Sequence, residues 1–379
     1  MRVLMAPDRI DGGPAGPDPA MSAVDVAAHL ARGWTSSRPA DSIVVHPMSD
    51  GGAGFLEALT AVLGGEREAA LARDPWGAQL PTEWLRVGET AYIETAPLLG
   101  DPQADDAARL AAEGSSDGVG DVVLAAVRAG VRRVVLGVGR VGTHDAGVGA
   151  LRAVAGAAGD TPVGEVVRAA VEVLRGVEVL VAAAAREPLV GLSGAGAALA
   201  ARPGIDAAAA QARELALAGI VARIEQAVPR RPSLLAQESA DQVRGSRRPH
   251  AGAGGGVAFA LAAAGARVLP GAAVVAVETG LAEAVEHADL VLTAATALDG
   301  GALDDGVPGA VGRVALAALI PAVAVAPTVM VSRRELSGTG LEAIYPLEDP
   351  SAPGRTTPSS DLRSALSQRA SRVARTWSR

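Results

Sequence analysis

Four aspartates stand in glycine-rich turns, and their carboxylates are the first candidates for chemistry. Asp8 lies in APDRIDGG, Asp50 in PMSDGGAG, Asp145 in GVGRVGTHDAG and Asp299 in ALDGG. A carboxylate in such a turn can hold a metal ion, accept the proton of a substrate hydroxyl or cap a helix. Each turn follows an expected strand, and ligands of open α/β sheets bind beyond the carboxyl ends of strands. We therefore expect the four aspartates to share one edge.

Two glycine-rich stretches could let the backbone approach an anion closely. GVGRVG at 137–142 fits the G-x-G-x-x-G string and lies between an expected strand and an expected helix. Amide groups and the dipole at a helix start favour a phosphate or carboxylate there. A nicotinamide site is disfavoured, because no acidic residue ends a next strand about twenty residues further on. The second stretch, HAGAGGG at 250–256, is compatible with ligand binding and equally with close helix packing.

Short apolar strands near both ends of the chain predict one open sheet. RVLMA at 2–6 and SIVVH at 42–46 alternate with helical segments such as 21–34, as in doubly wound proteins. Similar strands return late in the chain, at 288–294, 320–327 and 341–347. Together these strands predict a flavodoxin-like sheet of two early and three late members.

The middle of the chain has a different pattern and predicts an inserted domain. The segment 74–96 is typical of an antiparallel hairpin, and further helices and strands lead to a loop rich in arginine and proline at 228–250. HAGAGGG is then expected to open a long apolar helix. The predicted organisation is an α/β protein with two α/β domains. An open-sheet domain at 1–70 plus 285–379 is interrupted by a larger domain with a mixed sheet at 71–284.

Composition excludes several kinds of site and partner. All 34 basic residues are arginines, so no step can use a lysine, and the absence of cysteine excludes disulfides and thiolate chemistry. The net charge of −8 argues against nucleic acid as a partner. No apolar run is long enough to span a bilayer, and MRVLMAPD is too short to be a signal peptide. We therefore expect a cytoplasmic protein with neither a nucleic-acid nor a membrane partner.

The order of the turns resembles the bacterial glycerate kinase family over essentially the whole chain. In chain order, the stretches that carry the resemblance are APD, PM.DGG.G, ETA, GVG…T.DAGVG, EPL.G..GA, GAGGG, ADLVLT and LDGGAL…VP. The resemblance implies two α/β domains, the outer one flavodoxin-like and discontinuous, with the active site in the cleft between them. It also implies transfer of phosphate from ATP, with Mg²⁺, to a hydroxyl group of D-glycerate.

Several polar positions of that family are replaced in this chain. Arg9 and Asp11 stand where the family has serine and lysine, and two later lysine positions hold Pro203 and Gly306. Further replacements of polar residues are Ala53, Val141, His144, Ala184, Glu187 and Ala295. Phosphoryl transfer gathers negative charge, and losing one stabilising group typically costs on the order of a hundredfold in rate. Arg9 or Arg140 could supply the missing charge, because arginine binds phosphate well.

The turns and the resemblance together define one set of candidate site residues. The catalytic candidates are Asp8, Asp50, Asp145 and Asp299. The candidates for binding substrate or phosphate are Gly51, Gly52, Gly137, Gly139, Arg140, Gly142, Thr143, Gly254 and Gly255. The expected ligands are ATP with Mg²⁺ and glycerate or a similar small hydroxy acid, with no metal ion held by the protein alone.

Three functions stay open at this point. The first is phosphorylation of D-glycerate. The second is a catalytically impaired homologue that binds a small acid, a nucleotide or a protein partner. The third is a kinase that acts on another small acid and uses arginines. The oligomeric state is not predicted.

Overall fold

The chain divides into two compact units, and each is described by itself. In the computed structural model, the described residues are 1–11, 20–202, 204–228, 245–332, 334–347 and 362–378. The first unit consists of Met1–Asp50, Glu57–Gly64 and Gly271–Arg379, and the second of Gly51–Leu56 and Gly65–Pro270. Most of the loop expected at 228–250 lies outside the described residues.

A five-stranded parallel sheet forms the centre of the first unit. Its strands are β1 (Arg2–Met5), β2 (Ser42–Val45), β9 (Leu290–Ala294), β11 (Ala322–Ala326) and β13 (Leu341–Pro346). The order β13-β11-β9-β1-β2 is the flavodoxin-like order, which confirms the open sheet of two early and three late strands. The order reverses at β1, which pairs with β2 on one side and with β9 on the other.

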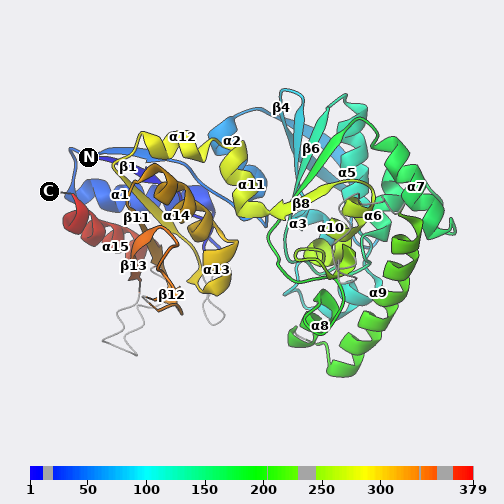
Figure 1. Ribbon diagram of the computed structural model, residues 1–379. Helices are drawn as coiled ribbons and strands as arrows, with labels where there is room; N and C mark the ends of the chain where they lie inside the picture. The colour runs from blue at the N-terminus through cyan, green and yellow to red at the C-terminus, as the bar shows by residue number, and fades with distance from the viewer. Residues whose placement is uncertain (12–19, 203, 229–244, 333, 348–361, 379) are drawn as a thin grey trace, which may run out of the picture. The chain divides into compact units, whose positions relative to one another are not determined.

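Helices cover both faces of this sheet. α1 (Ala23–Ser37) and α15 (Leu362–Trp377) lie side by side on one face (Figure 1). The Ser22 side chain caps α1, and Val26 and Leu30 are buried at helical spacing, in agreement with the helix expected at 21–34. α14 (Val307–Ala318) contacts β9 and β11. The remaining short elements are α2 (Phe55–Leu63), α11 (Gly271–Glu278), α12 (Leu281–Glu286), α13 (Gly300–Asp304), β10 (Ala297–Leu298) and β12 (Thr328–Val329).

A six-stranded mixed sheet forms the centre of the second unit. Its strands, in sheet order, are β3 (Glu66–Arg73), β4 (Gln79–Val87), β5 (Thr90–Glu94), β6 (Arg133–Val138), β7 (Glu178–Ala183) and β8 (Arg267–Pro270). β4 is antiparallel to both β3 and β5, and the strands from β5 to β8 are parallel. The inserted mixed sheet and its antiparallel hairpin are therefore confirmed.

The helices of the second unit supply its main apolar core. They are α3 (Ala96–Leu99), α4 (Ala107–Glu113), α5 (Asp117–Arg128), α6 (Val148–Ala155), α7 (Val163–Val173), α8 (Ala195–Ala198), η1 (Leu199–Ala201), α9 (Ala207–Ala227), η2 (Gly245–Arg247), η3 (Ala253–Gly256) and α10 (Val257–Ala263). Small and branched apolar residues from α5, α6, α7 and α10 pack with the sheet in one continuous cluster. The alanine-rich composition thus serves close packing of helices on strands.

Three local features differ from the sequence prediction. The segment EREAALAR forms the edge strand β3, for which no expectation was made from the sequence; pairing with β4 overrides the intrinsic preference of its glutamates, arginines and alanines for a helix. The strand β8 was not predicted either. The expected long apolar helix after HAGAGGG is wrong, since α10 ends at Ala263 and Gly265 follows with a φ of +105°.

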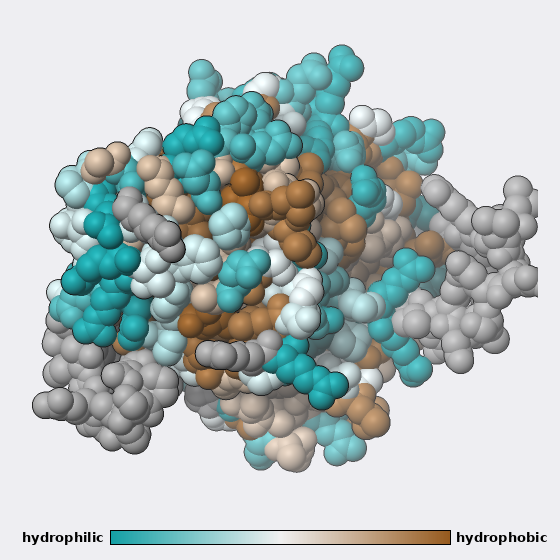
Figure 2. Space-filling view, turned by 60° about the vertical axis from the view of Figure 1, so that its left-hand side comes forward, coloured by the Kyte–Doolittle hydropathy of each residue, from teal (hydrophilic) through white to brown (hydrophobic). Residues whose placement is uncertain are grey.

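Some apolar side chains reach the surface of the protein. Figure 2 shows brown hydrophobic groups among teal hydrophilic ones on one face. In the first unit, Val44 and Val45 on the edge strand β2 are 52% and 44% exposed. Among the described residues, none of the helices combines the length and the apolar character that a membrane crossing requires.

Candidate functional site

Two aspartates come together at the carboxyl edge of the first unit's sheet. Asp8 follows β1 and Asp50 follows β2, and these strands are neighbours. The amide of Asp8 donates to the carbonyl oxygen of Ala294 at the end of β9 over 2.8 Å, which holds the turn after β1 beside that strand. Asp8 therefore lies where the strand order reverses, the place where ligands of such sheets bind.

The surroundings of Asp8 favour its protonated form. Burial and the nearby charge of Asp50 raise the pKa of Asp8 well above its usual value. The Arg9 amide opposes this shift by donating to Asp8 Oδ1 over 2.8 Å. A carboxyl group with a raised pKa beside a second carboxylate is a candidate proton acceptor, and perturbed groups of this kind gather at functional sites.

Other polar groups of the first unit's turns are engaged within the chain. The Nη2 atom of Arg9 lies 2.7 Å from Asp11 Oδ1, so the guanidinium group is paired with a carboxylate of its own turn. Asp299 accepts the amide of Ala302 over 2.8 Å and caps α13. Asp299 therefore has the local role that aspartate commonly has at a helix start.

The expectation that all four turn aspartates share one edge is wrong, because Asp145 belongs to the other sheet. Asp145 lies in the second unit, after β6 and before α6. Its Oδ2 accepts the amide and hydroxyl of Ser116 over 2.9 and 2.8 Å and the amide of Gly149 over 3.0 Å. Its Oδ1 accepts the amide of Gly147 over 2.8 Å. This carboxylate thus fills the helix start that an external anion would otherwise occupy.

The glycine string before Asp145 leads from the end of β6 into the turn before α6, which confirms the expected order of strand, turn and helix. α6 begins at Val148, well beyond Gly142. The three glycines make room for close neighbours, which are Phe55 for Gly137, Gly52 for Gly139 and Leu110 for Gly142. The absence of side chains at these three positions is therefore required by packing.

The turn before α2 also packs closely against a neighbouring strand. Gly51 has a φ of +95°, and a Cβ atom there would overlap the carbonyl oxygen of Ala182 in β7. Only glycine fits such a position without strain. The start of α2 is capped by Glu94, which accepts the amides of Gly54 and Leu56 over 2.9 and 3.0 Å. A second helix start is thus filled by a carboxylate of the chain.

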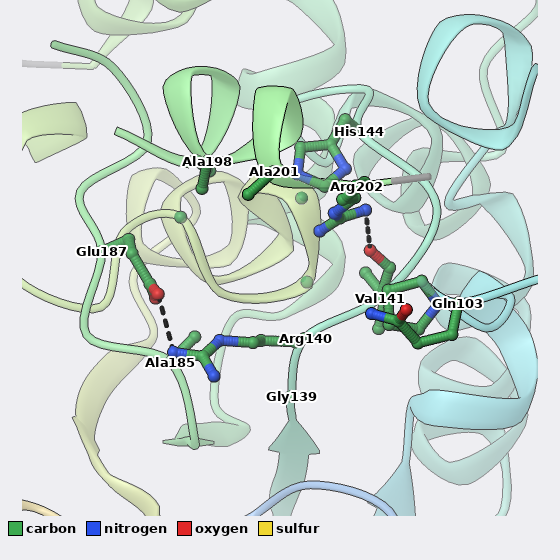
Figure 3. Close-up of a pocket in the computed structure, with 15 residues that line it drawn as sticks. Gln103, Gly139, Arg140, Val141, His144, Ala185, Glu187, Ala198, Ala201 and Arg202 are labelled. Atoms are coloured by element: carbon green, nitrogen blue, oxygen red, sulfur yellow. Dashed lines mark hydrogen bonds and ion pairs between the residues drawn. The ribbon is translucent and has the colours of Figure 1, made fainter. Parts of the chain in front are cut away.

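A cavity of about 270 Å³ in the second unit collects charged side chains (Figure 3). Arg140, from the loop after β6, points toward Glu187 and donates to its Oε1 over 2.8 Å. Arg202, just after η1, donates to the carbonyl oxygen of Val141 over 2.8 Å. Two guanidinium groups face one carboxylate here, and this excess of positive charge suits an anionic ligand.

Glycines form part of the cavity wall. Gly139, Gly254 and Gly255 line it, and the amide of Gly254 donates to the carbonyl oxygen of Gly139 over 3.0 Å. The amides of Arg140 and Val141 donate to no acceptor within the part of the chain that the structure describes. Free backbone amides beside guanidinium groups are what small oxyanions bind in proteins.

His144 contributes a neutral ring to this cavity. Its Nδ1 lies 3.1 Å from the carbonyl oxygen of Gly142, and a carbonyl can only accept, so this nitrogen carries the proton. Burial, with the charge of Arg202 nearby, lowers the pKa of His144 to about 3. The adjacent Thr143 is buried, and its hydroxyl oxygen has no hydrogen-bond partner among the described residues.

Arg202 is the cavity residue that sequence reasoning missed. Burial and the charge of Arg140 lower the pKa of Arg202. Arg202 immediately precedes Pro203, the position that the family resemblance matches to a lysine, and Pro203 itself lies outside the described residues. The available signal in the sequence was that Arg202 is adjacent to a position where the family resemblance expects a lysine.

The wall glycine Gly255 should be intolerant of any side chain. It has a φ of +62°, and a Cβ atom would overlap the carbonyl oxygen of Thr143. Gly255→Ala should therefore lower the free energy of unfolding by about 3 kcal/mol, from strain plus displaced backbone. Gly156 is the matched control, because it has a φ of +61° and open space around it. Gly156→Ala should cost only about 1 kcal/mol in urea denaturation, and equal losses in both variants would contradict the steric explanation.

The first unit's aspartate pair fits a magnesium ion that arrives with a substrate. In the described part of the chain there is no group of three or more histidine, aspartate or glutamate side chains arranged to hold a metal ion. Mg²⁺ usually keeps several waters and is held by one or two carboxylates together with substrate phosphates. Asp50 provides a carboxylate of that kind, and Asp8 lies beside it.

Comparison with known proteins identifies the family. The model of the glycerate kinase family matches residues 4–378. The chain belongs to the glycerate kinase family. An uncharacterized protein of Mycobacterium bovis is 33% identical over 350 residues, which cover 90% of this chain and 83% of that protein. Glycerate 2-kinase of Escherichia coli is 25% identical over 362 residues, which cover 91% of this chain and 90% of that protein.

A solved structure supports the same fold for this glycerate kinase family member. A crystal structure from Salmonella typhimurium, assigned to a glycerate kinase 2, superposes with a TM-score of 0.73 at 23% sequence identity. The match covers 99% of this chain and 98% of the other. The family resemblance and the α/β fold class with its inserted mixed sheet are therefore both confirmed.

Proposed function

We propose that this protein transfers the terminal phosphate of ATP to a hydroxyl group of a small hydroxy acid, with D-glycerate the first substrate to test. The observation that carries the proposal is the pair Asp8 and Asp50 at the reversal point of the first unit's sheet. A carboxylate whose pKa is raised accepts a hydroxyl proton more readily at neutral pH than an ordinary aspartate.

The proposed step assigns separate tasks to these two residues. The carboxylate of Asp8 takes the proton of the substrate hydroxyl group. The oxygen of that hydroxyl attacks the terminal phosphorus of ATP, and ADP leaves. Asp50 would hold the Mg²⁺ that accompanies ATP, and this ion supplies the positive charge that offsets the phosphates. Positioning and charge account for most of the catalysis in phosphoryl transfer.

The cavity of the second unit supports an anionic substrate. Arg140 and Arg202 would replace the cationic function of the absent lysines, because arginine binds carboxylate and phosphate groups through paired N–H donors. The exposed Arg140–Glu187 pair is weak enough to open for a ligand, since the Arg140 side chain is 71% exposed.

A catalytically impaired homologue that binds a small acid or a nucleotide is the second candidate. It is favoured by one observation: Arg9 and Arg140, the arginines that could replace lost lysines, each already pair with a carboxylate. In this case Asp8 and Asp50 would remain as parts of an inherited binding site. A cytoplasmic location is inferred for either function from the sequence.

Release of ADP distinguishes the two candidates. Protein with ATP, Mg²⁺ and D-glycerate should form ADP at a rate that depends on the acid. No turnover with a panel of small hydroxy acids, combined with calorimetric binding of ATP, would leave only the non-catalytic candidate.

The role of Arg140 is tested in the same assay. Arg140→Gln should raise the KM for the acid by about tenfold, since one charge-assisted contact is worth about 1.5–3 kcal/mol. Arg132→Gln is the control, because Arg132 forms an exposed pair with Glu89 and does not line the cavity. An unchanged KM in Arg140→Gln would refute the use of this arginine.

A further inference from the structure

A second hollow in the second unit gathers three arginines. It has a volume of about 530 Å³ and is lined by parts of α6, α7, α9 and the segment before α7. Arg152 comes from α6, Arg168 from α7 and Arg223 from α9, and α7 packs against both α6 and α9 (Figure 1). No residue of this hollow lines the cavity that contains Arg140 and Arg202.

The charges of these arginines are not compensated. Within the described ranges, the side chains of Arg152, Arg168 and Arg223 form neither an ion pair nor a hydrogen bond. The Nε atom of Arg152 is enclosed and has no acceptor, which is costly for a polar group unless a ligand satisfies it. Asp160 also lines the hollow but is not within ion-pair distance of any of the three.

The start of α7 opens into the same hollow. Pro162 precedes this helix and offers no side-chain cap. The amides of Val163 and Gly164 have no acceptor among the described residues, whereas the starts of α2 and α6 are filled by Glu94 and Asp145. Uncapped amides and a helix dipole add to the attraction for an anion.

We propose that this hollow binds the phosphate group of a small phosphate monoester. Three arginines and Asp160 leave two net positive charges, which match the dianion that such a group carries at neutral pH. Arginine forks and backbone amides are the usual donors to phosphate oxygens. The site takes a phosphorylated metabolite or free phosphate, and it does not depend on the proposed kinase activity.

Calorimetry on the full chain tests this site with two probes, glycerol 3-phosphate and inorganic phosphate. The wild type should bind glycerol 3-phosphate, and Arg168→Gln combined with Arg223→Gln should weaken this binding by about a hundredfold, or about tenfold per arginine. Both side chains are exposed, so the double variant should fold normally, which circular dichroism checks. Equal affinity for both probes identifies free phosphate as a sufficient ligand, and weaker binding of inorganic phosphate identifies a monoester.

Two control variants test whether the phosphate binds in this hollow. Arg128→Gln changes an exposed arginine of α5 outside the hollow and should leave the affinity unchanged, as should Arg140→Gln in the other cavity. The proposal is overturned if the wild type binds neither probe, if acetate competes equally well, or if the double variant retains the wild-type affinity. Loss of binding in Arg140→Gln alone would move the phosphate to the other cavity and refute this site.

Discussion

Asp8→Asn should reduce ADP formation by about a hundredfold to ten-thousandfold while raising the thermal stability of the protein at pH 7. Asparagine is close in size to aspartate but cannot accept the hydroxyl proton, so the loss should fall on kcat. Burial and the charge of Asp50 both disfavour the ionised form of Asp8. Removing that ionised group therefore removes a destabilising interaction.

The sign of the stability change follows from proton binding. The folded pKa of Asp8 is raised above the unfolded pKa, so the folded state keeps a proton at pH values where the unfolded state has lost it. The stability that the protonated Asp8 side chain contributes is fully present below the unfolded pKa, and it is lost as the pH rises through the folded pKa. The advantage of Asp8→Asn in melting temperature should therefore be larger at pH 7 than at lower pH, and it should vanish as the pH falls to the unfolded value, about 3.9.

Asp25→Asn is the matched control for this pair of effects. Asp25 is an exposed aspartate of α1 in the same unit, and its replacement should change stability by less than about 0.5 kcal/mol and leave turnover intact. An Asp8→Asn variant that melts at a lower temperature than wild type at pH 7 would contradict the inference that ionised Asp8 beside Asp50 destabilises the folded protein. Retained turnover would exclude Asp8 as the base.

The sheet of the first unit could be predicted because its strands are short, apolar and bounded by turns. Met5 and Leu292 lie on neighbouring strands although they are far apart in the sequence. Each belongs to a segment whose own apolar pattern is sufficient to predict a strand. β3 lacks this pattern, since glutamate, arginine and alanine are poor indicators of a strand. Only its pairing partner β4 determines its structure, and pairing is not a local property.

The site was predictable to a similar extent and for the same reason. Asp8 and Asp50 were found because each follows a recognisable strand end. Arg202 was not found, because it reaches the cavity from an irregular segment after η1 whose path depends on tertiary packing. The partner of Asp145 was hidden as well, since Ser116 lies in a separate segment of the chain.

Asp145→Ala should lower the free energy of unfolding of the second unit by about 3 kcal/mol, more than a typical helix cap contributes. The carboxylate accepts four hydrogen bonds, from Ser116, Gly147 and Gly149, and it connects the start of α5 with the start of α6. The hydroxyl of Ser116 continues this network by accepting the amide of Ala150 over 2.9 Å. Alanine leaves these donors without an acceptor in a partly buried place, where the loss is largest.

Thermal and urea denaturation measure this effect, and Asp206→Ala is the control. Asp206 caps α9 through a single exposed hydrogen bond of 2.7 Å to the amide of Ala209, so its replacement should cost about 1 kcal/mol. For a unit of this size, the Asp145→Ala loss corresponds to a fall of about 6–12 °C in melting temperature. If Asp145→Ala instead melts like the wild type and only loses turnover, Asp145 acts in catalysis and the four hydrogen bonds are dispensable for stability.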